Sequence, residues 1–501
     1  MIASMSLSPF QRITPWVKIP SLVTVRRCVH TRVAHVCLAA VGVLLTACVN
    51  HTPPNLAQPL PAQWQHPLAA TLLPAPDLHL WWKAFNAPDL DGLIDQSLQH
   101  NLTLAAAREH IQAARILAGS SPHQFLPDLH FATDELPAAS STNSFFRAGL
   151  QSSWELGLFG KKDATAQVAQ GELSGIEAQA EMARVALVAE VVHDWVTLRT
   201  AQQQVILLNQ MIEHLQQQIK LTEARVQLGL SPSSALAALQ SMQSRQVLVR
   251  LDKQAEADLA LEQLALLQGS AIGDLQLAQP TVQPVIADLP IQSLPTDLIR
   301  IRPDIQQAQA TVLQATGELG VATAQRYPSV SIAGSYMYSL QLLGKFNFHA
   351  NSIHGVGALG PEIDIPLFDW GLRKAKADAQ GAELKAAVYA YRQTVLEAVH
   401  EVESSIVGMN TQQQRVVQQG KIVSASQQSL SAHQSLQQLG LASTLETAED
   451  QQALLQAQLE LTDVHKDHDL AYVAMYKALG GAPLMSDSVQ QTPVLAARGG
   501  D

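Results

Sequence analysis

The chain has 501 residues, of which 15% are charged and 5% are aromatic, and its formal net charge is −11. This acidic balance disfavours nucleic acid as a partner, because a phosphate backbone attracts basic surfaces. Low charge combined with abundant Ala, Leu and Gln is typical of long helices, and it argues against a string of ordinary globular domains.

Residues 1–47 are predicted to be a cleaved signal peptide. They hold five basic residues and no acidic ones, and a short apolar run leads into Leu-Thr-Ala directly before Cys48. That run is too short to span a membrane, and small residues before the cut are typical of an export signal. The pattern resembles the lipobox of bacterial lipoproteins, in which this cysteine carries the lipid. No cysteine follows Cys48, so the mature chain can form no internal disulfide.

Residues 48–79 contain seven prolines, so we interpret them as the lipidated Cys48 followed by an extended tether. The first structural unit is expected at 80–268 and begins with a helical apolar pattern that reaches Leu117. Strands are predicted at about 128–136 and 147–159. In the second strand the residues alternate, with one face apolar and the other polar: Leu150, Trp154, Leu156 and Leu158 against Gln151, Ser153 and Glu155.

A helix is predicted at about 161–228, and at 1.5 Å per residue it would be about 100 Å long. Gly229 ends it, and Ser231-Pro232 opens a returning helix that reaches about residue 268. Residues 269–295 hold four prolines and are interpreted as an irregular connector.

The same plan then repeats over 296–480. Strands are predicted at about 329–340 and 356–368, a long helix at about 373–439, and a returning helix after Gly440. We matched Phe368 with Phe159 at an offset of 209, and Gly440 with Gly229 at an offset of 211. Residues 481–501 are predicted to be a disordered tail.

After the signal peptide no run of 18 or more residues is apolar, so no helix is expected to span a membrane. The strands have the length and alternation of membrane strands, but small closed barrels need at least about eight of them. Four strands per chain therefore require several chains, and three chains would supply twelve.

Six segments carry a specific resemblance to the TolC-like outer-membrane factors, and the lipobox before Cys48 places the chain in their NodT-like lipoprotein branch. They are 81–85 (WWKAF), 298–305 (LIRIRPDI), 327–330 (YPSV), 366–369 (PLFD), 401–403 (EVE) and 476–481 (YKALGG). The resemblance implies a homotrimer whose twelve-stranded transmembrane β-barrel continues into a long periplasmic α-helical coiled-coil barrel. It also implies the exit duct of a tripartite efflux pump that works with a periplasmic adaptor and an inner-membrane transporter of the resistance–nodulation–division class. Neither catalysis nor a cofactor is implied.

The two helix turns are the first candidate site. The resemblance implies that Leu228, Gly229 and Leu230, with Leu439, Gly440 and Leu441, form the periplasmic tips that meet the adaptor. Apolar closure of each turn on its own helix is an equal alternative. The resemblance also implies that Glu446 and Glu449 ring the periplasmic aperture. The pattern Ser-Thr-Leu-Glu at 443–446 is a capping box, which explains Glu446 without a gate.

The strand-to-helix junctions are the second candidate site, at Phe159-Gly160 and Phe368-Asp369, where we expect the chain to leave the lipid. His465 and His468 are three residues apart and could bind a metal, but a solvated helix face is the preferred interpretation. Two other functions remain open: a duct for type I protein secretion, and a structural periplasmic lipoprotein that conducts nothing.

Overall fold

The computed structural model describes residues 52–56, 58–59, 64–65, 80–137, 143–271, 286, 301–343 and 354–481. The predicted signal peptide, Cys48, most of the tether and connector, and residues 482–501 lie outside the described residues.

The first half of the chain begins with short helices and ends in a long helical hairpin. Its elements are η1 (Trp81–Phe85), α2 (Pro88–His100), α3 (Leu102–Ser120), η2 (Ser121–Phe125), β1 (Asp128–Pro137), β2 (Asn143–Glu155), α4 (Lys161–Gln227) and α5 (Ser233–Leu267).

The second half repeats this order with α7 (Pro303–Ala324), β3 (Ser329–Leu343), β4 (His354–Asp364), α8 (Leu372–Gln438) and α9 (Thr444–Ala478). The long helices α4 and α8 both have 67 residues, and the returning helices α5 and α9 both have 35. All four start and end positions are shifted by the same 211 residues, for example from Lys161 to Leu372. The chain is thus an internal duplication whose helical arms match in length.

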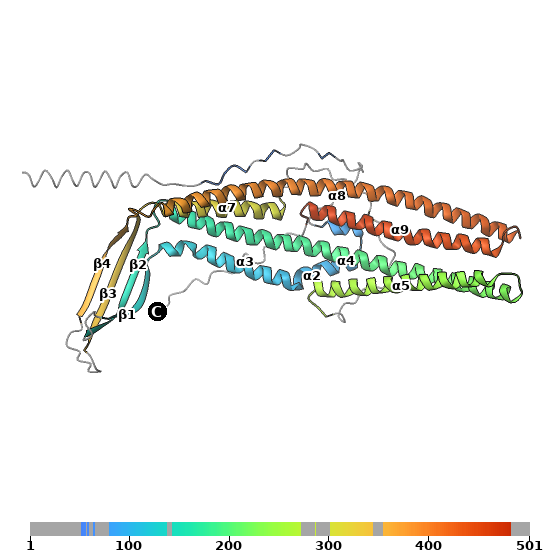
Figure 1. The fold of residues 1–501 in the computed structure, drawn as a ribbon, viewed down its shortest axis with the longest axis horizontal. Coiled ribbons are helices and arrows are strands. Elements are labelled where there is room, and N and C mark those ends of the chain that lie inside the picture. Colours follow the sequence, from blue (N-terminus) through green and yellow to red (C-terminus); the bar gives the residue numbers. More distant parts are fainter. Residues whose placement is uncertain are drawn as a thin grey trace, which may run out of the picture.

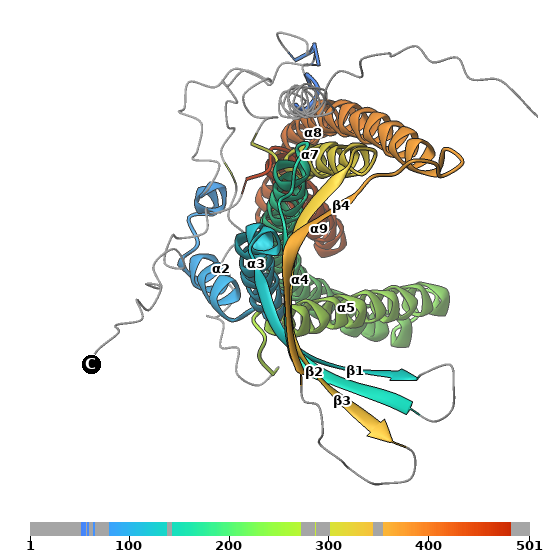
Figure 2. The same cartoon turned by 90° about the vertical axis from the view of Figure 1, so that its left-hand side faces the viewer.

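The four strands form a sheet at one end of the molecule, and α4 and α8 run from that sheet to the opposite tip (Figure 1). The helices α3 and α5 lie roughly end to end beside α4, and α7 and α9 lie in the same way between α4 and α8. Viewed from the sheet end, the helices form an open, curved layer with α2 on its convex side (Figure 2). One edge of this layer is α3 with α5, and the other edge is α8.

The sheet is antiparallel with the order β1-β2-β3-β4, so β1 and β4 are its free edges among the described residues. The register places apolar side chains on one face, because Phe131, Leu150 and Tyr336 lie opposite one another across three strands. The other face is mainly polar or small, as in the row of His130, Gln151 and Ser335, and Met337 is a buried apolar exception on it. The exposed large apolar side chains of the first face include Leu129, Phe131, Leu150, Trp154, Tyr336, Tyr338, Leu359 and Ile363. This is the alternation of a sheet with one lipid-facing and one wet side.

The predicted ends of two strands are wrong. The strand placed at 147–159 is Asn143–Glu155, and the strand placed at 356–368 is His354–Asp364. Leu156 and Leu158 therefore lie beyond the strand whose apolar face they were expected to extend. For β2 the physical reason is Gly157, two residues after Glu155, because its φ of +58° is a conformation that does not continue a strand.

An aromatic core holds the middle of the helical layer, where η1 and α2 cover α4 and α9. Trp81 stacks on Tyr476 with ring centroids 5.4 Å apart, and the Tyr472 hydroxyl donates a 2.9 Å hydrogen bond to the Trp81 carbonyl. Asp89 of α2 accepts hydrogen bonds from Trp195 and Arg199 of α4 at 3.0 and 2.5 Å. Burial favours the neutral carboxyl, but these hydrogen bonds outweigh it and lower the pKa of Asp89.

Within the part of the chain that the structure describes, no helix has both the length and the apolar character needed to cross a bilayer.

Candidate functional site

The strand-to-helix junctions share one backbone conformation. Phe159 and Gly160 have φ values of 55° and 80°, and Trp370 and Gly371 have 56° and 82°. Both glycines occupy the N-cap position of a long helix, and a side chain there would be strained. The counterpart of Phe159 is therefore Trp370 at the offset of 211, so our match with Phe368 was wrong.

The side chains at these two junctions have different surroundings. Phe159 is half-buried and stacks on Tyr327, with ring centroids 5.1 Å apart. Trp370 is 90% exposed and Phe368 is 75% exposed, and these two rings contact each other at 4.7 Å. Asp369 accepts hydrogen bonds from the backbone N–H groups of Gly371 and Arg373 at 3.0 and 2.9 Å, so it holds the first turn of α8.

A cavity of about 650 Å³ lies where the sheet meets the long helices. It is lined by both signs of charge: Lys161 pairs with Glu155 at 2.5 Å, and Arg373 lies 3.8 Å from both Asp364 and Asp369. These ion pairs connect the ends of β2 and β4 to the starts of α4 and α8. The three acidic and three basic side chains that line the cavity leave it with little net charge.

The short and returning helices meet at two joints, which the sequence analysis did not identify. In the first joint, Asn101 caps α3 and its Nδ2 donates to the carbonyl of Leu267 at the end of α5, at 2.9 Å. In the second, Arg302 precedes α7 and its Nη1 donates to the carbonyl of Ala478 at the end of α9. Leu267 and Ala478 are related by the offset of 211, so the two joints are equivalent.

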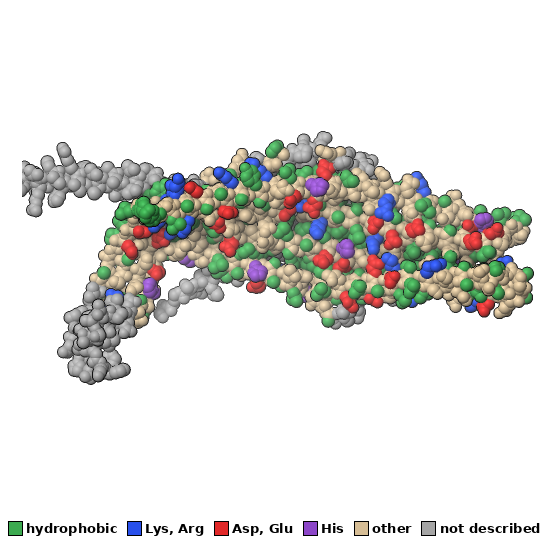
Figure 3. Space-filling view, in the orientation of Figure 1, with side chains coloured by type: hydrophobic (Ala, Val, Ile, Leu, Met, Phe, Trp, Pro, Cys, Tyr) green, Lys and Arg blue, Asp and Glu red, His purple; other side chains and the backbone are tan. Residues whose placement is uncertain are grey.

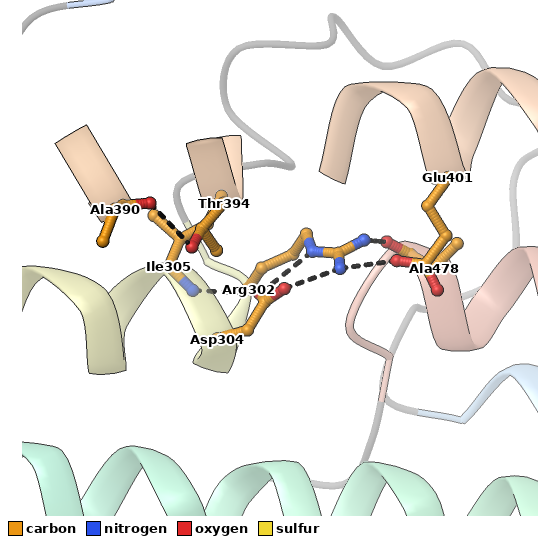
Figure 4. Close-up of polar contacts among 7 residues, drawn as sticks. All are labelled: Arg302, Asp304, Ile305, Ala390, Thr394, Glu401 and Ala478. Atoms are coloured by element: carbon orange, nitrogen blue, oxygen red, sulfur yellow. Dashed lines mark hydrogen bonds and ion pairs between the residues drawn. The ribbon is translucent and has the colours of Figure 1, made fainter. Parts of the chain in front are cut away.

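The second joint carries more charge than the first (Figure 4). The Arg302 guanidinium also bonds the Asp304 carboxylate through Nε and Nη2, and it reaches Glu401 of α8 at 2.7 Å. Burial lowers the pKa of Arg302, but the hydrogen bonds to Asp304 and Glu401 outweigh it and raise that pKa. A single side chain thus ties α7, α8 and α9 together.

The far ends of the two hairpins are closed by the same turn. Leu230 N–H bonds to the Arg225 carbonyl at 2.8 Å, and Gly229 N–H bonds to the Val226 carbonyl at 3.0 Å. Leu441 and Gly440 make the corresponding bonds, and both glycines have positive φ, as a Schellman motif requires. All four flanking leucines (Leu228, Leu230, Leu439 and Leu441) are 66–73% exposed. The backbone closes each turn, and the leucines remain largely free of their own helices.

The two candidate aperture acids lie just beyond the second turn but differ in their bonding. Glu446 completes the capping box: it accepts from Ser443 N–H at 2.7 Å and its own N–H donates to the Ser443 hydroxyl at 3.2 Å. The hydrogen bonds from Ser443 lower the pKa of Glu446. Glu449 is exposed and lies nearly one turn further along α9. The capping interpretation of Glu446 is therefore confirmed, and its carboxylate is already bonded.

A second contact that the sequence analysis missed joins α8 to α9 near this tip. His433 Nδ1 pairs with the Asp450 carboxylate, which also accepts a 3.1 Å hydrogen bond from the Ser429 hydroxyl. The hydrogen bond to Asp450, aided by the charge of Glu446, raises the pKa of His433. A comparison of the two repeats at the offset of 211 could have identified this contact. The first hairpin has uncharged Thr222 and Leu239 at the positions where the second has His433 and Asp450.

The solvated face predicted for the two histidines of α9 is wrong for His468. Its side chain is buried beside Asp469, at 3.6 Å, while His465 is half-buried. Burial lowers the pKa of His465. Among the described residues there is no group of three or more His, Cys, Asp or Glu side chains that could hold a metal ion.

Comparison with known proteins gives a consistent result. The family model described as "Outer membrane efflux protein" matches residues 93–270 and 294–481. The chain is 27% identical over 471 residues to the pyoverdine export outer membrane protein OpmQ of Pseudomonas putida, covering 89% of this chain and 97% of that one.

Two further similarities extend over nearly the same length. Nodulation protein T of Rhizobium leguminosarum bv. trifolii is 25% identical, with 88% of this chain and 95% of that protein covered. The solved structure of the outer-membrane channel OprN superimposes with a TM-score of 0.73 at 25% identity, covering 86% of this chain and 99% of that channel.

Proposed function

This chain belongs to the outer membrane efflux protein family, and we propose that three copies of it form one duct through which small toxic molecules leave the cell. The protein is an outer-membrane exit duct of an efflux pump, and it extends into the periplasm. The proposal of a trimer rests on the open sheet, which has one apolar face and, among the described residues, four strands and two free edges. Unpaired strand edges are not tolerated in lipid, so the edges must be closed by further copies.

The helical layer supports a conduit that continues below the sheet. Each long helix of 67 residues is about 100 Å long and starts within a few residues of a strand. Three curved layers closed edge to edge would enclose a passage lined largely by amides. Such a lining suits passive movement of varied solutes, because it offers no tight binding site. The energy and the choice of cargo belong to the inner-membrane transporter, which is of the resistance–nodulation–division class in our proposal.

The exposed leucines at the two tips are the proposed adaptor contacts. Leu228 and Leu230 on one turn and Leu439 and Leu441 on the other would enter apolar grooves of a periplasmic adaptor. Glu449 is the proposed aperture acid, with Glu446 contributing from its capped position.

Cys48 is the proposed lipid anchor, so Cys48→Ala should abolish incorporation of radiolabelled palmitate.

The test is a deletion strain complemented with the intact chain or with variants. Loss of the chain should raise sensitivity to dyes, detergents and aromatic drugs, and the intact chain should restore resistance. Leu230→Asp with Leu441→Asp should fail to restore it, although the variant still forms trimers in detergent. Unchanged drug sensitivity together with lost export of a secreted protein would favour the secretion duct. If purified trimers gave no conductance in planar bilayers, even as Glu446→Ala with Glu449→Ala, the structural lipoprotein would be favoured.

A further inference from the structure

We infer that the tether after Cys48 docks on the helical layer of its own chain at two points, and that the short spacer left free sets how each chain meets the membrane. The inference rests on the proposed lipid anchor at Cys48. The described part of the tether, in dark blue, runs beside α8 from the sheet side towards the middle of the layer (Figure 1).

The first docking point is the indole of Trp64. It is half-buried, and it packs against the aromatic core and against a separate apolar cluster of Ile305, Val395 and Ala398. Its ring N–H is buried and has no hydrogen-bond partner in the described part of the chain. The side chain is therefore held by apolar contacts, and a phenyl ring should serve in its place.

A hydrogen bond attaches the next residue to the second joint. The Gln65 N–H donates to the Glu403 carboxylate of α8 at 2.7 Å. Glu403 lies two residues after Glu401, which Arg302 of the joint reaches at 2.7 Å. The offset of 211 places Val192 at the position equivalent to Glu403, so the first half offers no carboxylate there. The tether is thus attached where one arginine already ties α7, α8 and α9 together.

The second docking point is a cavity of about 520 Å³ between α3, α4 and α7. Pro53 and Leu56 of the tether line it, and Leu56 is half-buried. All three helices contribute buried apolar residues to its lining, namely Ile111, Ala178, Ala310 and Val312. Arg115 of α3 and Glu177 of α4 also line it and pair at 3.0 Å. The tether therefore closes one side of a cavity whose other sides are helical.

The two docking points lie at different distances from the sheet. On α8, the segment from Val395 to Glu403 lies about 35–47 Å from the start of the helix. On α4, the cavity residues Ser174 to Glu181 lie about 20–30 Å from the start of that helix. From Gln65 back to Pro53, the tether therefore approaches the sheet.

Docking determines how much chain is left free to reach the membrane. Pro53 is five residues from Cys48, and a fully extended chain of that length spans at most about 18 Å. This span is close to the distance of about 20 Å between Ser174 and the start of α4. Without docking, the 32 residues from Cys48 to Leu80 could span about 110 Å, which is the length of a whole helical arm. The docked tether thus restricts the lipid to the sheet end.

The sheet end has the surface of a membrane contact. Hydrophobic side chains lie beside Lys and Arg side chains where the sheet meets the start of α8 (Figure 3). Exposed side chains of this segment include Trp370 and Lys374. Aromatic and basic side chains together are typical of a membrane–water interface. A lipid held close to this end would bring each single chain to the bilayer sheet first, before further copies close its edges.

Hydrogen exchange of the full-length lipidated chain tests the docking. Trp64→Asp should raise exchange of residues 52–65 by about tenfold, because it places a charge among apolar side chains. Trp64→Phe is the matched control and should keep exchange slow, since it retains a ring and removes an N–H that has no partner. Leu56→Asp should raise exchange of residues 52–56 and leave that of Gln65 slow.

Insertions test the spacer. An insert of about eight Gly and Ser residues after Asn50 should slow trimer formation in the outer membrane by about fourfold, because effective concentration falls as the −3/2 power of spacer length. The same insert after Leu73, on the other side of Trp64, is the matched control and should leave the rate unchanged. In a chain with Leu56→Asp and Trp64→Asp, both inserts should act alike. Trimers from pulse-labelled cells are measured on gels without heating.

The outcomes separate the docked tether from the duct. Fast exchange of residues 52–65 in the unaltered chain would overturn the inference, as would equal effects of the two inserts, including no effect, in the chain without substitutions. Absence of palmitate on Cys48 would also overturn it, since the spacer would hold nothing at the membrane. Slow exchange and a position-dependent insert effect in a chain that neither conducts nor confers drug resistance would support the docking and remove the proposed function.

Discussion

The two halves of the chain have the same backbone plan but differ in what surrounds equivalent residues. In the first half, Phe159 stacks on Tyr327 and the hairpin end holds Thr222 and Leu239. In the second half, Trp370 is exposed, and His433 and Asp450 form an ion pair at the positions equivalent to those two residues. At these equivalent positions the first half makes an internal aromatic contact and has no ion pair, while the second has an exposed tryptophan and a charged pair near its tip. The two halves therefore share their backbone plan and differ in the side chains that their equivalent positions carry.

The largest expected effect compares Gly317 of α7, which contacts α4, with Ile116 of α3, which lies 201 residues earlier in the first half of the chain. Gly317→Ile should destabilise the chain by about 3 kcal/mol or more, because its side chain would enter the backbone of α4. Ile116→Gly, at the equivalent outer position, should cost a single chain only about 1 kcal/mol through helix propensity. Denaturant unfolding followed by circular dichroism measures both, and equal losses would contradict the difference between the contacts.

The joints provide the next comparison. Arg302→Ala removes the bonds to Ala478, Asp304 and Glu401 and should cost about 3 kcal/mol, since these are hydrogen bonds of a charged donor that is 7% exposed. Asn101→Ala removes a cap and the bond to Leu267 and should cost about 1–2 kcal/mol. The same unfolding measurement applies, and a larger loss for Asn101→Ala would refute the ranking.

Substitutions of the two junction aromatics, Phe159 and Trp370, should distinguish an effect on chain folding from an effect on trimer assembly. Phe159→Ala should cost about 1–2 kcal/mol in any state of the protein, because a half-buried stacked ring is lost. Trp370→Ala should leave the unfolding of a single chain unchanged and should lower the trimer fraction measured by light scattering in detergent. Loss of chain stability in Trp370→Ala would show that its partner is internal.

The tips should differ in their response to pH. The pKa of His433 is raised in the folded chain by Asp450, with Glu446 as the other nearby carboxylate. The ion pair therefore contributes fully below the ordinary histidine pKa of about 6.5, and it is lost as pH rises through the raised folded value. Hydrogen exchange at 430–450 should speed up over that window, beyond its intrinsic pH dependence, and that at 219–239 should not. In His433→Gln the difference should disappear.

The smallest expected effect concerns the two acids of the second tip. Glu446→Gln weakens the capping box and should increase proteolytic cleavage near Ser443, whereas Glu449→Gln should leave cleavage unchanged. Both should reduce cation selectivity of the conductance if they line the aperture. Selectivity changed by Glu446→Gln alone would assign the aperture to the capped residue.

Features with a clear period or a special residue could be predicted from the sequence. The long helices, the turns at Gly229 and Gly440 and the alternating face of β2 all follow from apolar spacing and from glycines that need a positive φ. The end of β2 could not be placed, because Leu156 and Leu158 keep the apolar alternation on either side of Gly157, where the chain turns. The joints at Asn101 and Arg302 were also missed, since each bonds to a carbonyl more than 160 residues away. No local pattern encodes such a partner.

The equal length of the two hairpins has a mechanical consequence. Each arm has 67 residues outward and 35 back, with a positive-φ glycine before it, at its turn and after its end. In the trimer that we propose, six hairpins of equal length would end in a level rim, so that a docking partner would meet a flat ring and could bind it in any of three orientations. Inserting one residue into a single arm would lift its tip by about 1.5 Å and turn it by about 100°. The two arms are therefore free to lengthen or shorten only together, and by whole turns.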